Sequence, residues 1–172
     1  MFLNPQVPTQ TLPRVDHVQW QPLHPRYVRE QQLVRGVVIV IIAIAWFVLM
    51  PWKGASALAI IPFYIVALIA GVALVLWPSV EVPRRGFALR EHDMIYRHGV
   101  LFRKVTAVPF NRIQHVEVSN GPLDRRFGIG TLKLFTAGGS GGDLLVEGLP
   151  IELAEQLREH ILGKAGVAIE RD

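Results

Sequence analysis

Three arginines are the side chains of this sequence best suited to binding chemistry. Arg125 and Arg126 are adjacent and precede Phe127, while Arg112 lies in an Asn-Arg-Ile segment. Guanidinium groups form paired hydrogen bonds to phosphate or carboxylate, so arginines at a bend can bind an anionic lipid headgroup or a partner's carboxylate. A structural interpretation stays open, in which Arg126 bonds turn carbonyls and Phe127 packs in the core.

The other polar side chains show no pattern typical of an active site or a metal site. The six histidines lack the H-x-x-x-H and H-E-x-x-H spacings of zinc proteins, and there is no cysteine. The glycine-rich stretch 137–143 precedes a strand pattern rather than a helix, which favours a hairpin turn over a phosphate loop. Serines and carboxylates form no catalytic constellation. We therefore expect no enzymatic activity, no metal and no cofactor.

A long apolar segment determines where these side chains are placed. Between Arg35 and Glu81, 45 residues contain a single charge, Lys53. A bilayer core about 30 Å thick needs roughly 20 apolar residues in a helix, so this segment can cross twice. The sequence Pro51-Trp52-Lys53-Gly54 is typical of a turn between two helices. We expect a transmembrane hairpin over 26–80, with helices at about 36–52 and 55–77.

A cleaved signal peptide is the alternative interpretation of the first apolar stretch. Ala55-Ser56-Ala57 offers a small-x-small cleavage pattern. However, some 35 residues precede the stretch, and a second apolar segment follows it at once, which argues against cleavage.

Basic residues near the helix ends predict the orientation of the hairpin. Lys and Arg accumulate on the cytoplasmic side, and the turn contains only Lys53. Both chain termini are therefore expected in the cytoplasm. Trp52 and Trp77 are placed to act as interface anchors. The juxtamembrane basic residues are Arg26, Arg29, Arg35, Arg84 and Arg85.

The segments outside the hairpin differ in character. Residues 1–25 contain five prolines and no apolar periodicity, which predicts an extended N-terminal arm. Residues 81–172 contain thirteen basic and twelve acidic side chains, so they show no basic excess typical of nucleic-acid binding. They show short apolar runs separated by turns, which predict a small antiparallel sheet or barrel. The expected strands are 87–90, 94–97, 102–110, 113–118, 131–136 and 144–149.

Two helices are expected in this C-terminal domain. Residues 123–127 are long enough for a single helical turn. Ile151, Ala154, Leu157 and Ile161 recur at helical spacing, and Gly163 is a natural stop. The fold class is therefore an α+β membrane protein in which a C-terminal helix caps the sheet.

A resemblance to a known family follows from several motifs in order. After the hairpin come VPFNRIQHV at 108–116, GPLDRRFGIGTL at 121–132, TAGG at 136–139 and VEGL at 146–149. Over about residues 25–163 the chain resembles the YdbS-like family of bacterial PH-domain membrane proteins, whose domain was once called a membrane-flanked domain of unknown function. The resemblance implies a pleckstrin-homology-like (PH-like) split β-barrel with a C-terminal capping helix, in the bacterial cytoplasmic membrane. It implies no established chemistry, and the arm lies outside it.

Two functions are compatible with these features. The first is a non-enzymatic integral membrane protein that presents a cytoplasmic PH-like domain for assembly with itself or another membrane protein. The alternative is recognition of anionic lipid headgroups by Arg112, Arg125 and Arg126 in envelope stress or lipid homeostasis. Clustering of these arginines in a pocket facing the membrane would favour the second. An enzyme or transporter is disfavoured because the two spans contain no charged residue apart from Lys53 at the turn.

Overall fold

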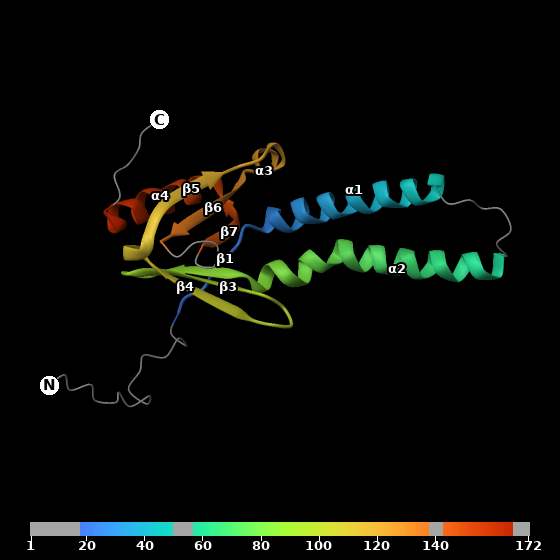
Figure 1. Ribbon diagram of the computed structural model, residues 1–172, viewed down its shortest axis with the longest axis horizontal. Helices are drawn as coiled ribbons and strands as arrows, with labels where there is room; N and C mark the ends of the chain where they lie inside the picture. Colours follow the sequence, from blue (N-terminus) through green and yellow to red (C-terminus); the bar gives the residue numbers. More distant parts are fainter. Residues whose placement is uncertain (1–17, 50–56, 138–142, 167–172) are drawn as a thin grey trace, which may run out of the picture.

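Two long antiparallel helices project from one end of a small β domain (Figure 1). The computed structural model describes residues 18–49, 57–137 and 143–166. Helices α1 (Pro25–Leu49) and α2 (Ala57–Glu81) are both long and apolar enough to cross a membrane. They expose apolar side chains along most of their length, which a protein surrounded by water would bury. The predicted hairpin is confirmed, while its turn, with Trp52 and Lys53, lies outside the described residues.

Both helices extend beyond the predicted membrane spans on the side of the β domain. Helix α1 begins at Pro25, eleven residues before Gly36, and α2 continues to Glu81. These extensions pack on the domain, since Tyr27 and Pro78 are both buried. The helices are therefore longer than the predicted spans 36–52 and 55–77, and their outer ends lie within one residue of the predicted hairpin range 26–80.

The β domain consists of two antiparallel sheets and a C-terminal helix. The first sheet has the order β1-β2-β3-β4 and the second has the order β5-β6-β7. Helix α4 (Ile151–Ala165) packs on the second sheet. This is the split barrel with a capping helix that the resemblance implies. The strands are β1 (Gln21–Pro22), β2 (Gly86–Leu89), β3 (Asp93–His98), β4 (Lys104–Pro109), β5 (Ile113–Ser119), β6 (Ile129–Thr136) and β7 (Leu144–Pro150).

Three short helices connect these elements. The 3₁₀ helix η3 (Val82–Arg84) joins α2 to β2, and η4 (Phe110–Arg112) joins the two sheets between β4 and β5. Helix α3 (Pro122–Phe127) lies between β5 and β6, where a single helical turn was expected. The expected strand 102–110 is wrong at its start, because β4 begins only at Lys104.

The core lies between the second sheet, the first sheet and α4. On β6, Leu132 and Leu134 alternate with more exposed neighbours and are fully buried. The predicted apolar stripe of α4 is buried at Ala154, Leu157 and Ile161. This helix does not stop at Gly163 as predicted. It ends at Ala165, and Gly166 adopts the left-handed conformation (φ +67°) that glycine tolerates best.

The end of the predicted N-terminal arm belongs to the β domain. Gln21 pairs with Phe87 and Pro22 with Gly86, and Leu23 is buried in the core. The backbone N–H of His24 donates a 2.8 Å hydrogen bond to the carbonyl of Gly148. The prediction of a separate arm is therefore wrong for residues 18–24, and residues 1–17 lie outside the described residues. The hairpin is thus an insertion between β1 and β2, and the domain predicted to start at residue 81 also includes residues before the hairpin.

Candidate functional site at the membrane junction

A polar network joins the two long helices to the β domain. Tyr27, in the first turn of α1, donates a 2.8 Å hydrogen bond to Oε2 of Glu147 on β7. The guanidinium of Arg85 donates to the same oxygen at 3.0 Å and to Oε1 of Glu81 at 2.5 Å. Arg85 therefore bridges a carboxylate at the end of α2 and one on the last strand. The hydrogen bonds of Tyr27, Arg85, Glu81 and Glu147 thus connect α1, α2 and β7.

Further contacts join α1 to α2 next to this network, on the side away from the β domain. Arg35 lies 3.5 Å from Oε2 of Glu81 and donates to the carbonyl of Leu74 at 3.4 Å. The amide of Gln32 donates to the hydroxyl of Ser79 at 2.9 Å. Because these bonds lie where the helices leave the apolar region, they fix the spacing of the helices at the domain.

The electrostatics of the network keep its cation charged. Burial is the largest single effect and lowers the pKa of Arg85, but the hydrogen bond to Glu81 and the charge interactions with Tyr96, Tyr27 and Glu81 together outweigh it, so the pKa is raised overall. Burial raises the pKa of the neighbouring Tyr96 phenol, which keeps it neutral. A charged guanidinium shared by two carboxylates is an arrangement that stabilises structure, and it leaves little capacity for a ligand.

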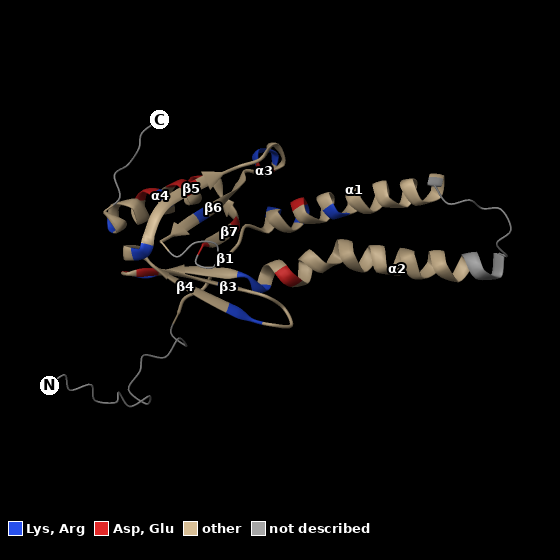
Figure 2. Ribbon diagram, viewed as in Figure 1, with Lys and Arg blue, Asp and Glu red and all other residues tan. Residues whose placement is uncertain are grey.

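The three arginines proposed for binding do not form one pocket. Arg125 and Arg126 lie exposed on α3, which contacts α1, whereas Arg112 lies exposed on η4, which contacts α4. The seven residues of β5 separate η4 from α3, and a strand of that length spans about 20 Å. Figure 2 shows the basic residues of α3 and η4 at different ends of the domain. A headgroup site that uses all three arginines is not supported.

The turn at Phe127 is bonded by a different arginine from the one expected. Arg26, at the start of α1, donates a 3.3 Å hydrogen bond to the carbonyl of Phe127. The Asp124 carboxylate accepts a 2.8 Å bond from the Gly121 N–H, which closes the start of α3. Phe127 packs against the core, as the structural interpretation expected, while Arg126 stays exposed.

Most juxtamembrane arginines contact the protein itself. Arg26, Arg35 and Arg85 hold the contacts described above, and Arg84 donates to the carbonyl of Val80. Arg29 is exposed on α1. Trp77 is exposed on α2, near the domain end of the hairpin, and its role as an interface anchor stays a prediction.

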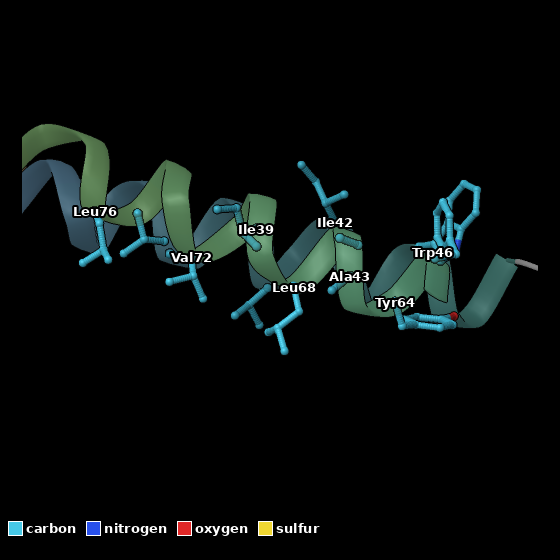
Figure 3. A pocket seen from close by; sticks show the side chains of 14 residues that line it. Ile39, Ile42, Ala43, Trp46, Tyr64, Leu68, Val72 and Leu76 are labelled. Carbon is cyan, nitrogen blue, oxygen red and sulfur yellow. The ribbon is translucent and has the colours of Figure 1, made fainter. Parts of the chain in front are cut away.

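An apolar groove of about 630 Å³ runs between α1 and α2. Its walls are apolar apart from Tyr64 and Trp46, and Figure 3 shows side chains of both helices along it. Trp46 stacks on Phe63 at 5.7 Å near its outer end. The small residues that line it are Gly36, Ala43, Ala67 and Gly71.

Several residues of this junction could not be predicted from the sequence. Tyr27 and Glu81 belong to no motif, and Glu147 lies in the VEGL motif at 146–149 without being recognised as a site residue, although an acidic residue within an apolar strand pattern is a signal for a buried partner. The exposed Phe102 was expected to begin the strand 102–110, whereas it lies with Leu101 before β4. In the part of the chain that the structure describes, no group of three His, Asp or Glu side chains is arranged for a metal ion.

Comparison with known proteins agrees with this architecture. The Bacterial PH domain family matches residues 32–165, which include most of the hairpin and nearly all of the β domain. The UPF0699 transmembrane protein YdbS of Bacillus subtilis (strain 168) is 29% identical over 90 residues, which are 52% of this chain and 55% of that protein. The matched region thus spans about half the length of that relative. No solved structure matches the chain significantly. With its two apolar helices and its split barrel capped by α4, this membrane protein belongs to the bacterial PH domain family.

Proposed function

We propose that this chain is a non-enzymatic membrane protein that presents its PH-like domain in the cytoplasm for assembly with a second copy of itself or with another membrane protein. The apolar groove between α1 and α2 is the observation that carries the proposal. Helices associate in lipid by close packing at small residues, because lipid supplies no hydrophobic driving force between them. A groove bordered by Gly36, Ala43 and Ala67 gives a partner helix such a surface.

The junction network supports the same function. Since Arg85, Glu81, Glu147 and Tyr27 bond the hairpin to the domain, a partner would meet both in a fixed relative position. Such preorganisation lowers the entropic cost of binding. A partner that binds groove and domain together therefore gains from this rigid junction.

The orientation is testable because the chain has no cysteine. We expect a cysteine introduced at Lys53 to react with a membrane-impermeant maleimide in intact cells. A cysteine at Glu155, on α4, is expected to react only after the membrane is permeabilised. The reverse pattern would place the domain outside and contradict the cytoplasmic assignment.

The assembly itself is tested by filling the groove. No atom lies within 4 Å of a Cβ built at Gly36, which lines the groove, so Gly36→Leu introduces a side chain there without a clash at Cβ. The matched control is Val37→Leu, because Val37 is half exposed and does not line the groove. We expect in-membrane crosslinking of the intact protein to capture a homo-oligomer or one defined partner, with capture lost in Gly36→Leu and kept in Val37→Leu. Equal capture by both variants, or capture of nothing specific, would refute assembly through the groove.

Recognition of anionic lipid headgroups is the second candidate function. It is favoured by the exposure of Arg125 and Arg126 on α3, beside the first turns of α1. This function is tested by identifying the lipids that co-purify with the intact protein. Enrichment of anionic lipid that is lost in Arg125→Ala/Arg126→Ala and kept in Arg112→Ala would support it. Enrichment that is absent, or unchanged in the double variant, would leave assembly as the main role.

A further inference from the structure

The loop between β3 and β4 carries the most exposed large apolar side chains of the domain. Leu101 is 82% exposed and Phe102 is 90% exposed. Both exceed Val48, at 72% the most exposed large apolar side chain on the described part of the hairpin. Adjacent apolar side chains presented to this degree mark a contact with another apolar phase.

The conformation of this loop depends on Gly99. The residue has φ +101°, and a Cβ there would lie 1.9 Å from the carbonyl oxygen of Phe102. Only glycine fits so tight a turn. The two strands stay in continuous register up to the pair formed by His98 and Lys104. The loop is therefore a defined turn at the end of a regular β3–β4 hairpin, with Leu101 and Phe102 at its tip.

The tip points in the direction in which the membrane helices leave the domain. Figure 1 shows the β3–β4 hairpin extending along the long axis toward the side of α1 and α2. The base of the loop lies near the end of α2, because Gly86, five residues after Glu81, pairs with Arg97, which directly precedes His98. Glu81 is the first charged residue after the apolar part of α2. A loop that starts at this level and points along the helices reaches toward the bilayer surface.

The residues that follow the tip suit the lipid headgroup layer. Arg103 and Lys104 are both exposed and come directly after Phe102. Cations at this depth are attracted by anionic lipids, while apolar and aromatic side chains enter the boundary with the acyl chains. The order of two apolar and then two basic residues matches that layering.

From this geometry we infer that the β3–β4 loop inserts Leu101 and Phe102 into the bilayer leaflet next to the domain, while Arg103 and Lys104 bind phosphates of anionic phospholipids. The loop is a third membrane attachment besides the two helices. Because it lies on the first sheet, away from α3, it also limits the tilt of the domain against the membrane. This inference is independent of assembly through the groove.

Site-directed spin labelling of the full-length protein tests the insertion. Single cysteines replace Leu101 or Phe102, and the protein is reconstituted in vesicles of phosphatidylcholine with or without phosphatidylglycerol. Val48→Cys is the lipid-embedded control, and Asn111→Cys, exposed on η4, is the water-exposed control. We expect labels at 101 and 102 to be accessible to oxygen and protected from a water-soluble nickel complex, as at 48. Accessibility like that at 111 in both vesicle types would overturn the inference.

Two further experiments distinguish binding of the loop to lipid from binding of the loop to a protein partner. Arg103→Gln/Lys104→Gln is expected to reduce the protection of label 102 in vesicles that contain phosphatidylglycerol. No change in that variant would overturn the role of the two cations. Protection in native membranes that disappears in vesicles of the purified protein would instead assign the loop to a protein partner and overturn insertion. Leu101→Ser/Phe102→Ser is expected to keep the thermal unfolding midpoint in detergent, because neither side chain packs in the core.

Discussion

The phenolic oxygen of Tyr27 lies 2.8 Å from Oε2 of Glu147, so the first turn of the membrane hairpin is hydrogen-bonded to the last strand of the β domain. The ring itself packs over Gly148, which has φ +70°. A Cβ at Gly148 would lie 2.4 Å from Cγ of Tyr27. The close approach of α1 to β7 therefore requires glycine at this position, both for its backbone conformation and for space.

The first prediction concerns this contact. Gly148→Ala should lower the thermal unfolding midpoint strongly, because it adds a left-handed alanine and a clash with a buried ring. Tyr27→Phe loses one hydrogen bond and should cost about 1 kcal/mol. Both are measured by thermal unfolding of the full-length protein in detergent micelles.

Gly163→Ala is the matched control for Gly148→Ala. Gly163 is an exposed residue within α4 with no atom within 4 Å of its Cβ position. Alanine is favoured over glycine in a helix by about 0.5–1 kcal/mol, so this variant should be slightly more stable. Wild-type stability of Gly148→Ala would show that α1 does not pack on β7 as described.

A second prediction concerns the bridge made by Arg85. Arg85→Ala leaves the partly buried carboxylate of Glu147 without its cation and leaves Glu81 with only the longer contact to Arg35, which should cost about 1–3 kcal/mol of unfolding free energy. Arg85→Lys should restore little, because a single ammonium cannot reproduce the fork that reaches both carboxylates. The measurement is a double-mutant cycle with Glu147→Ala.

The pair of Lys133 and Glu117, whose cation is more exposed than Arg85, is the control for this cycle. It joins β5 and β6 at 3.0 Å, with side chains 30% and 40% exposed. Lys133→Ala should change stability by no more than about 0.5 kcal/mol, since it removes a single ion pair at the surface, where water still screens the charges. A coupling between Arg85 and Glu147 as small as that of the control pair would contradict a structural role for the bridge.

The sequence was sufficient for features that depend on local composition. The hairpin follows from 45 residues with one charge, and the stripe of α4 follows from the spacing of Ala154, Leu157 and Ile161. The domain strands follow from short apolar runs between turns, and the motifs at 108–116 and 121–132 specify the family.

Features that depend on contacts distant in sequence could not be predicted. Strand β1 is two residues long and exists only because β2 pairs with it across the inserted hairpin. Tyr27 and Glu147 are 120 residues apart, so no spacing rule relates them. Phe102 looked like a strand residue because it is aromatic. It is exposed because Gly99 turns the chain before β4 begins.

A third prediction tests whether residues 18–24 are part of the domain. Leu23 is buried among the core residues, so Leu23→Ala should cost about 2–4 kcal/mol and lower the unfolding midpoint clearly. Gln21→Ala is the control, because Gln21 is exposed and contributes its backbone to the pair with Phe87. If the two variants unfold alike, this segment is not packed and the extended-arm interpretation is restored.

The last prediction concerns the pH dependence at the base of the β3–β4 loop. His98 stacks on Tyr96 at 5.6 Å. Burial is the main cause that lowers the pKa of His98, the charges of Arg85 and Lys104 lower it further, and Glu81 opposes them. The folded protein therefore binds a proton at His98 less readily than the unfolded chain, whose histidine pKa is about 6.5.

The sign of the stability change follows from this difference. Between the two pKa values the unfolded state binds more protons, so the free energy of unfolding rises with pH in that window. The contribution of His98 is complete above its ordinary pKa and is lost as the pH falls through the folded pKa. An NMR titration of the His98 ring should give a pKa below the ordinary value. His98→Gln should flatten the pH dependence of the unfolding midpoint in the same window. A His98 pKa at or above the ordinary value would contradict the burial of the imidazole beside Arg85 and Lys104.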